Sequence, residues 1–457
     1  MNPSKRNQRT GGDKLPVRAF YRRNAIAAAM AFAILPASFA TPSAAFAEGA
    51  AAVAVRADTS VEDFYQRRDG APLWLAGGNQ ASAEKLLILL QSARVDGLDP
   101  SKYGDRKLSK ALRKAWGGDP KAVARADRML SELFVAYVND LKRVPTPGMT
   151  FVDPALGPRP QSAMSILLQA AKAPSLPDYV TSMGWMNPIY AAIRQAITNG
   201  SYAEPERQHV LAVNLARARA LPASGRYILV NPAQQKLYMY DNGRVADSMN
   251  VVVGRQKWPT PMFAANLRYA SLNPYWNVPP DLVPEDVAVY VLKYGVGYLK
   301  SRGYQVLSDW TDNATPVDPA SIDWQSVMDG KTEIRVRQLP GPRNVLGTVK
   351  YSMPNPFGIY LHDTSSPELL SKDIRLFSGG CIRLQDAKRL GTWLFGKPLS
   401  APSKDPDIQV PLDTPVPVFV TYLTAVPEGG SIAFLDDVYG RDGASPAAPE
   451  KQLASAS

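Results

Sequence analysis

The sequence predicts a multidomain α+β protein, in which a mostly helical N-terminal region precedes a predominantly β domain with a helical insertion. Before residue 222, apolar residues recur at spacings of three and four, which is the spacing of one helix face. From Arg226 onward, short apolar runs alternate with turn residues, which is typical of strands. We therefore expect a helical domain over 48–222, a β domain over 226–423 with a helical insertion at 281–330, and a C-terminal extension over 424–457 that is disordered from about 443.

Residues 1–47 are typical of an export signal. A basic leader up to Arg23 precedes the apolar run Ala25 to Leu35, and Ala45-Phe46-Ala47 matches a small-x-small cleavage site. The run is short for a membrane span and Pro36 follows it. We expect an exported protein with no stable membrane span after cleavage; a retained membrane anchor is the alternative.

The charge of the chain does not favour nucleic acid as a partner. The 52 basic and 41 acidic residues give a net charge of +11. Residues 1–47 hold seven basic residues and one acidic residue, so 45 basic and 40 acidic residues remain after cleavage. This excess of +5 is compatible with an anionic polymer as partner but does not require one.

The helical region is predicted from periodicity and from its stop signals. Ala83 to Val95 carries a leucine-rich face and ends at Asp96-Gly97, while prolines end the longest helix. Two later helices each begin with a proline, which suits the first turn. The expected helices cover 83–95, 122–144, 162–171, 188–198 and 205–218.

The β domain opens with a predicted hairpin. Two strands flank Asp241-Asn242-Gly243, a sequence that favours a tight turn between antiparallel strands. Near the C-terminal end of the domain, we expect one helix and one closing strand. The predicted strands are 227–230, 236–240, 245–254 and 416–422, and the predicted helix is 385–394.

Cys381 is the single cysteine of the chain, and His362, one of two histidines, precedes it by 19 positions. The run Phe357 to Leu361 is apolar and aromatic, and we interpret it as a strand that ends at the histidine. The other histidine, His209, lies in a charged helical stretch, where we expect a solvated side chain.

A cysteine and a histidine at this spacing fit nucleophilic acyl transfer. The thiolate needs a base, and the oxyanion that forms needs backbone N–H donors. Ser378-Gly379-Gly380 lets the backbone approach a substrate closely, so the N–H groups of Gly380 and Cys381 could face the oxyanion. A cationic histidine would lower the thiol pKa. The alternative is a buried cysteine in a core, but a lone thiol in an exported chain is a candidate nucleophile.

His362, the loop 363–377 and Ser378-Gly379-Gly380-Cys381-Ile382-Arg383-Leu384 resemble the signature of the L,D-transpeptidase catalytic domain, the YkuD-like fold. Many members have glycine directly after the histidine, where this chain has Asp363. Phe64-Tyr65-Gln66-Arg67 and Asn273-Pro274-Tyr275-Trp276-Asn277-Val278-Pro279 are similar to the large YcbB-like branch, which has a helical scaffold region.

The resemblance implies a substrate and a place of action. The donor would be a peptidoglycan tetrapeptide stem, cut after the L-centre of meso-diaminopimelate. The acceptor would be the side-chain amine of another stem, which gives a 3→3 cross-link. The protein would be periplasmic, in a Gram-negative envelope, and a carbapenem would acylate its thiol. No metal and no organic cofactor are implied.

Supporting roles are expected for five further residues. Tyr360 lies two positions before His362, so both side chains share one face of a strand, and its hydroxyl would assist the oxyanion or the substrate. Ser378 and Gly379 would contact the stem. Arg383 would bind a carboxylate or brace the loop, and Trp276 would line the groove or pack in the core. We expect a backbone carbonyl to orient His362, and residues 281–330 either to cap the site or to be a passive elaboration of the domain.

Three alternatives stay open. The same acyl-enzyme could transfer to water, to a free D-amino acid or to a lysine of an outer-membrane protein. The chain could instead be a non-enzymatic cell-wall scaffold, with the helical region as the working part. The third is a cysteine protease that acts on proteins, but this chain lacks the cysteine-first order of papain-like proteases, since His362 precedes Cys381.

Overall fold

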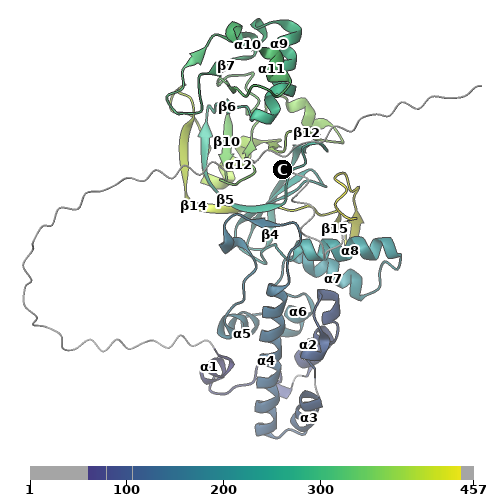
Figure 1. Cartoon of the computed structure of the whole chain (residues 1–457). Coiled ribbons are helices and arrows are strands. Elements are labelled where there is room, and N and C mark those ends of the chain that lie inside the picture. The colour runs from purple at the N-terminus through teal and green to yellow at the C-terminus, as the bar shows by residue number, and fades with distance from the viewer. Residues whose placement is uncertain (1–59, 79, 105, 444–457) are drawn as a thin grey trace, which may run out of the picture. The chain divides into compact units, whose positions relative to one another are not determined.

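The computed structural model describes residues 60–443, except 79 and 105. The expected export signal at 1–47 and the expected disordered tail after 443 lie outside these residues. The described helices and strands belong to one compact unit. Their order confirms the predicted class, with helices first and a β-rich part with helical elements after them (Figure 1).

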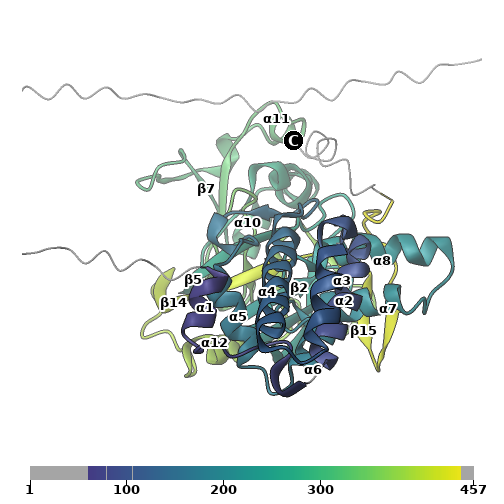
Figure 2. The ribbon, with the colours of Figure 1, turned by 90° about the horizontal axis from the view of Figure 1, so that it is seen from below.

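The N-terminal region is built around the long helix α4. Seen end-on, α5 lies on one side of α4, and α2 and α3 lie on the other (Figure 2). α4 begins at Pro120 behind the N-cap Asp119, whose carboxylate accepts hydrogen bonds from the first-turn amides. The helices are α1 (Val61–Gln66), α2 (Ala81–Gln91), α3 (Arg106–Ala115), α4 (Pro120–Arg143), α5 (Ala163–Ala171), α6 (Leu176–Thr181), α7 (Pro188–Thr198) and α8 (Pro205–Ala218).

The core of this region contains a buried ion pair. Asp96 is fully buried, and its carboxylate accepts hydrogen bonds from the Arg194 guanidinium at 2.8 Å and from the hydroxyls of Tyr137 and Tyr190 at 2.7 Å each. Helices α4 and α7 and the turn that ends at Asp96 are thus joined through one carboxylate. The sequence predicted a helix stop at Asp96-Gly97, but not this network.

The main sheet closes on itself. Its order is β1-β5-β10-β11-β13-β4-β3-β2-β14, and β14 also pairs with β5, so the ladder from β5 to β14 forms a ring around an apolar core. β12 pairs with β4. The strands are β1 (Thr150–Phe151), β2 (Tyr227–Asn231), β3 (Lys236–Asp241), β4 (Arg244–Gly254), β5 (Phe263–Leu272), β10 (Val349–Ser352), β11 (Leu361–His362), β12 (Leu376–Ser378), β13 (Ile382–Leu384) and β14 (Ile408–Val420).

The inserted segment is helical, as expected, but it also contributes strands that we did not predict. A π-helical turn (Pro284–Ala288) leads into α9, and the strands of this segment join β6 and β9 in a sheet of order β6-β9-β7-β8 with its own core. The elements are α9 (Val289–Tyr294), α10 (Gly297–Arg302), α11 (Trp324–Met328), β6 (Trp276–Asn277), β7 (Tyr304–Leu307), β8 (Pro316–Val317) and β9 (Arg335–Gln338).

Helix α12 (Ala387–Phe395) follows β13, and its bounds are close to the predicted helix 385–394. After β14, a hairpin of β15 (Ala425–Glu428) and β16 (Ser431–Phe434) leads into a C-terminal segment that is anchored at Asp442. The Asp442 carboxylate accepts hydrogen bonds from Arg217 of α8 at 2.7 Å and from the Thr424 hydroxyl at 2.6 Å. His209 is exposed and its Nε2 contacts the Asp442 carbonyl at 2.7 Å.

Candidate active site

Cys381 lies between β12 and β13, two strands that both pair with β4 but run in opposite directions. β12 runs parallel to β4 and β13 runs antiparallel to it, so the chain must reverse at Gly379-Gly380-Cys381. The thiol is half-buried and lies 3.7 Å from the carbonyl oxygen of Gly358, to which it donates. The alternative of an inert core cysteine does not describe this position, because the sulfur sits at the rim of the core and not inside it.

The imidazole of His362 is held on the neighbouring strand. β11 pairs in parallel with β13, with Leu361 opposite Ile382 and His362 opposite Arg383. Nδ1 of His362 lies 2.6 Å from the carbonyl oxygen of Asp363, so the orienting group is a backbone carbonyl, as expected. This contact assigns the proton to Nδ1 and leaves Nε2 as the basic nitrogen.

Strand register brings His362 and Arg383 to one face of the sheet. Partners on neighbouring strands point to the same side, and successive residues alternate. Leu361 and Ile382 are fully buried in the core. His362 and Arg383 therefore face the other side, while Tyr360 and Cys381 directly precede the two strands.

A lysine that the sequence analysis missed belongs to the same face. Lys350 of β10 is the antiparallel partner of His362, so Lys350, His362 and Arg383 form a row across three strands. Its ammonium lies 5.6 Å from the centre of the Tyr360 ring. The face thus carries two permanent positive charges beside the thiol and the imidazole.

The electrostatics of the site favour a neutral pair at rest. Burial, with smaller contributions from Arg383 and Lys350, lowers the pKa of His362 to about 3. Burial raises the pKa of the Cys381 thiol, although hydrogen bonds from Tyr360 and the charges of Arg383 and Lys350 oppose this shift. The expectation of a thiol pKa lowered by a cationic histidine is therefore wrong for this state, because burial dominates.

Ser378 braces the loop that carries the thiol. Its buried hydroxyl donates to the carbonyl oxygen of Cys381 at 2.6 Å and accepts from the N–H of Gly380 at 3.1 Å. The expectation that the Gly380 amide points freely at a substrate is not met, because this amide is already paired. In the described part of the chain, the amide of Cys381 has no hydrogen-bond partner and can take the role alone.

Two glycines of the loop are required by close approach. Gly380 has φ = 112°, in the region that side chains rarely adopt. A Cβ on Gly379 would lie 2.7 Å from Cδ1 of Leu282, which precedes the π-helical turn. The start of the inserted segment therefore packs directly on the loop before the thiol.

Thr260 supports the same loop from below and connects it to the C-terminal segment. Its buried hydroxyl donates to the Gly380 carbonyl at 2.8 Å and accepts from the Gly254 N–H at 2.9 Å. The Gly254 carbonyl accepts from the Tyr439 hydroxyl at 2.5 Å, and the Thr260 carbonyl accepts from Arg441 at 3.0 Å. Sequence could not reveal this support, since the fold brings Thr260 to Gly380, a residue 120 positions further along the chain.

The segment before His362 is a turn, and the predicted strand 357–361 is wrong except for its last residue. The Asn355 side chain donates to the Ile359 carbonyl at 2.7 Å and accepts from the amides of Phe357 and Ile359. Gly358 has φ = 65°, which a strand does not allow. The turn is what presents the Gly358 carbonyl to the thiol.

Tyr360 and Trp276 connect the thiol to the inserted segment. Burial, with a smaller contribution from the nearby Cys381, raises the pKa of the Tyr360 hydroxyl well above the usual range, and Tyr360 packs against the core that contains Trp276. The centre of the Tyr360 ring lies 5.7 Å from that of His362. Trp276 is 8% exposed and packs in the core of the smaller sheet, as one of the two expectations had it. It also lies close to the site, because Tyr360 packs against the same core.

Asp363, which departs from the glycine common at this place, has a structural partner. Its carboxylate accepts from both the amide and the hydroxyl of Thr348 at 2.8 Å. It also lies against Gly347, which has φ = 62°. Asp363 therefore fixes the turn that leads into β10 and so the position of Lys350.

The π-helical turn is bound to the loop after β4 by charge. Glu285 forms ion pairs with Arg255 at 3.1 Å and with Lys257. The neighbouring Asp286 interacts with both Arg255 and Arg383, while burial raises its pKa. Arg383 thus interacts electrostatically with both the thiol and an acidic residue of the inserted segment, and its buried Nε has no hydrogen-bond partner among the described residues.

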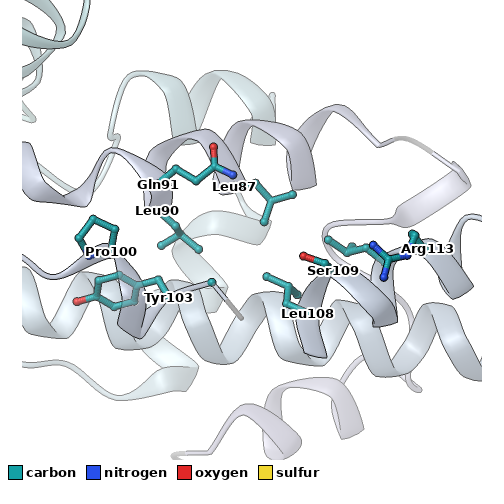
Figure 3. A pocket seen from close by; sticks show the side chains of 10 residues that line it. Leu87, Leu90, Gln91, Pro100, Tyr103, Leu108, Ser109 and Arg113 are labelled. Carbon is teal, nitrogen blue, oxygen red and sulfur yellow. The ribbon is translucent and has the colours of Figure 1, made fainter. Parts of the chain in front are cut away.

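No other part of the described chain offers a comparable constellation. A cavity of about 600 Å³ lies in the helical region (Figure 3), and none of its lining residues belongs to the sheet: Leu87, Leu90, Gln91, Pro100, Tyr103, Gly104, Leu108, Ser109, Leu112 and Arg113. Among residues 60–443, apart from 79 and 105, there is no group of three or more acidic, histidine or cysteine residues placed to hold a metal. None of the helices in that range is long and apolar enough to cross a membrane.

Comparison with known protein families places a match on each half of the chain. Residues 59–197 match the Scaffold domain, and residues 225–418 match the L,D-transpeptidase catalytic domain, YkuD. The second match contains β2 to β13 and every candidate site residue named above.

Similarity to individual proteins was found as well. A Haemophilus influenzae protein named "Putative L,D-transpeptidase" is 29% identical over 388 residues, covering 83% of this chain and 77% of that protein. The solved catalytic domain of an E. faecium L,D-transpeptidase is 18% identical and covers 43% of this chain and 97% of that one, with a TM-score of 0.19. The solved Ldtfm–avibactam carbamoyl enzyme is 15% identical and covers 44% of this chain, which spans 51% of that enzyme, with a TM-score of 0.22.

Proposed function

Because this chain carries an L,D-transpeptidase catalytic domain of the YkuD family behind a Scaffold domain, we propose that it forms 3→3 cross-links between peptidoglycan stems. The donor is a tetrapeptide stem, and the acceptor is the side-chain amine of meso-diaminopimelate in a second stem. The acyl group passes through a thioester on Cys381. Cell-wall material as the substrate follows from the family; the linkage, the intermediate and the acceptor are our proposal.

One observation carries the proposal: Cys381 directly precedes β13, and the parallel partner of β13, β11, ends at His362. A neutral imidazole whose pKa is about 3 is a competent proton acceptor at neutral pH. The thiol, whose pKa burial raises, then loses its proton as it attacks and not before. Such concerted transfer avoids a buried ion pair in the resting enzyme.

The steps follow from this pair. Sγ bonds to the carbonyl carbon of the donor while Nε2 of His362 takes the thiol proton. The oxyanion accepts hydrogen bonds from the Cys381 amide and the Tyr360 hydroxyl. Collapse breaks the peptide bond, and the leaving D-alanine amine takes the proton from His362. The acceptor amine then attacks the thioester, giving its proton back through His362, and the thiol is released.

Lys350 and Arg383 suit the charge of the substrate. Stem peptides carry carboxylates on diaminopimelate and on the terminal D-alanine, and both cations lie on the face of His362. Arg383 is partly buried with an unpaired Nε, so a substrate carboxylate would satisfy it. We assign Arg383 to carboxylate binding in preference to bracing the loop, and Ser378 to bracing in preference to contact with the stem.

The inserted segment favours an amine over water as the acceptor. Leu282 packs on Gly379, and Glu285 fastens the π-helical turn to Arg255 and Lys257 beside the site. A covered thioester is protected from hydrolysis. Transfer to water, to a free D-amino acid or to a lysine of an outer-membrane protein uses the same acyl-enzyme and differs only in what reaches it.

Two measurements test the proposal. Purified protein incubated with tetrapeptide-rich muropeptides should give 3→3 dimers and released D-alanine, whereas the Cys381→Ala variant should give neither. Tripeptide products without dimers would show hydrolysis, and dimers formed by Cys381→Ala would sink the mechanism and favour a scaffold role. Intact mass after exposure to a carbapenem should show one adduct on the wild type and none on Cys381→Ala.

We also propose that the protein works in the periplasm after removal of residues 1–47. The basic leader, the apolar run and the Ala45-Phe46-Ala47 site support export. N-terminal sequencing of protein recovered from the envelope should find Glu48 first. Recovery of a full-length chain in the membrane fraction would instead support a retained anchor.

A further inference from the structure

An uninterrupted series of aromatic side chains connects the thiol to the surface of the inserted segment. Tyr360, whose pKa is raised by burial and by the nearby Cys381, packs against the core that contains Trp276. The ring of Trp276 lies 6.2 Å from that of Tyr304, which lies 6.4 Å from that of Tyr298. The series ends on α9, where Tyr290 lies 5.3 Å and Tyr294 6.3 Å from Tyr298.

The outer end of the series is exposed. Tyr290 and Tyr294 are 41% and 59% exposed, and Leu292 and Val296 on the same stretch are 47% and 42% exposed. The rings of Tyr290, Tyr294 and Tyr298 are nearly parallel, with interplanar angles of 7° to 28°. Large side chains gathered on a surface, unlike a single exposed apolar residue, mark an interaction site.

We infer that the tyrosine face formed by Tyr290, Tyr294 and Tyr298 binds the glycan strand to which the donor stem is attached. The inference rests on the proposed function, because it is the stem at Cys381 that carries the glycan to this face. The electron-rich faces of tyrosine rings attract the partly positive C–H groups of a pyranose ring, and their hydroxyls can bond its polar edge. Because the three rings stack on one another, it is the exposed surface of Tyr290 and Tyr294 that would receive a sugar.

The surroundings favour a glycan over a membrane or a protein. Each outer ring is accompanied by a cation: Lys293 lies 5.0 Å from the ring centre of Tyr294, and Arg302 lies 5.8 Å from that of Tyr298. These groups can bond hydroxyl and amide oxygens of amino sugars. The continuity of the series with Tyr360 is the stronger argument, since the occupant of the face and the occupant of the thiol would be parts of one molecule.

The first experiment measures binding without catalysis. Peptide-free glycan strands, prepared by removing the stems from sacculi, are titrated into the full-length Cys381→Ala protein. A second protein adds Tyr290→Ser and Tyr294→Ser to that background. We expect binding in the first protein and a loss of affinity of about tenfold in the second, as removal of two stacking partners predicts. Tyr294→Phe, which keeps the ring face, should restore most of the affinity of a Tyr294→Ser protein.

The matched control is Trp310→Ser, which removes an exposed aromatic residue of the same inserted segment that is not part of the series. It should leave glycan affinity unchanged. Equal losses in Trp310→Ser and in the tyrosine variant would overturn the inference. So would absence of glycan binding by Cys381→Ala, or binding of the tyrosine face to phospholipid vesicles in place of glycan.

The second experiment separates this inference from the proposed function. With active protein, KM is compared for a free tetrapeptide and for the same stem attached to a disaccharide. The tyrosine variant should raise KM about tenfold for the disaccharide-linked stem alone, with kcat and the free-peptide KM unchanged. A KM raised equally for both substrates would contradict a glycan site. If the wild type turns over neither substrate, the proposed function fails, whereas the binding experiment still decides the glycan site.

Discussion

The hydroxyl of Ser378 donates a 2.6 Å hydrogen bond to the carbonyl oxygen of Cys381, three residues further along the chain. The hydroxyl oxygen of Ser378 in turn accepts a hydrogen bond from the amide of Gly380 at 3.1 Å. A buried hydroxyl that satisfies both ends of a three-residue reversal fixes the direction in which the Cys381 amide and thiol point. The side chain acts on the geometry of the nucleophile and not on its charge.

Replacement of Ser378 should therefore slow acylation while the thiol remains intact. For Ser378→Ala we expect a fall of about a hundredfold in the rate of carbapenem acylation, because loss of one oxyanion donor costs about 10²–10³ in rate. Stopped mass-spectrometric sampling of the adduct measures this rate. Ser371→Ala, at an exposed serine of the loop between His362 and Ser378, is the control and should leave the rate unchanged. Equal rates in Ser378→Ala and wild type would assign Ser378 to contact with the stem.

Removal of the Lys350 charge should move the thiol titration to higher pH. The ammonium stabilises the thiolate, so Lys350→Met raises the pKa of Cys381 further above its ordinary value. The alkylation rate at pH 7 should fall several-fold, and the pH–rate curve should shift upward. Lys388→Met, at an exposed lysine of α12, removes the same charge away from the site. A curve that shifts equally in both variants would indicate only a change in net charge.

Burial of neutral His362 should make the protein less stable in acid. The folded pKa is about 3, below the ordinary value of about 6.5. Between these values the unfolded chain binds the proton and the folded chain does not, so stability falls as pH drops through this window. The cost is about 1.4 kcal/mol per pH unit below 6.5. Urea unfolding of wild type and His362→Gln from pH 7 to 5 measures it: their difference should narrow as pH falls, whereas a constant difference would contradict the shift.

The buried carboxylate of Asp96 should be costly to replace. Asp96→Asn leaves the buried Arg194 guanidinium without a counter-charge, and loss of one partner of a buried pair costs about 3–5 kcal/mol. The free energy of unfolding, followed by far-UV circular dichroism in urea, reports the loss. Arg143→Ala breaks the exposed pair with Asp140 and should cost less than about 1 kcal/mol. A small effect for Asp96→Asn would mean that Tyr137 and Tyr190 hold the guanidinium through water.

Local patterns in the sequence predicted the fold well where structure depends on neighbours along the chain. Pro205 opens α8, and the Asp241-Asn242-Gly243 turn joins β3 to β4 as expected. The run 357–361 failed because its apolar residues suggested a strand, while Asn355 and the positive φ of Gly358 impose a turn. A turn set by one amide side chain leaves no periodic signal.

The site was predicted in its chemistry but not in its surroundings. Cys381 and His362 stood out because both residue types are rare in this chain. Lys350 lies in an ordinary strand, and only the pairing of β10 with β11 places it opposite His362. The small sheet that includes β6 and β9 was missed for the same reason, since its pairing joins residues far apart in the sequence.

The Tyr439 hydroxyl, a few residues before the end of the described chain, donates a hydrogen bond to the Gly254 carbonyl. This contact has a consequence for regulation by proteolysis. Thr260 connects this contact to the Gly380 carbonyl through a hydrogen bond. A single cleavage after the β15–β16 hairpin would therefore weaken the support of the turn at Cys381, while the closed sheet would stay intact. We expect such a cleaved chain to transfer acyl groups more slowly than the intact protein. The C-terminal segment that contains Tyr439 thus supports the loop of Cys381 from a distant part of the sequence.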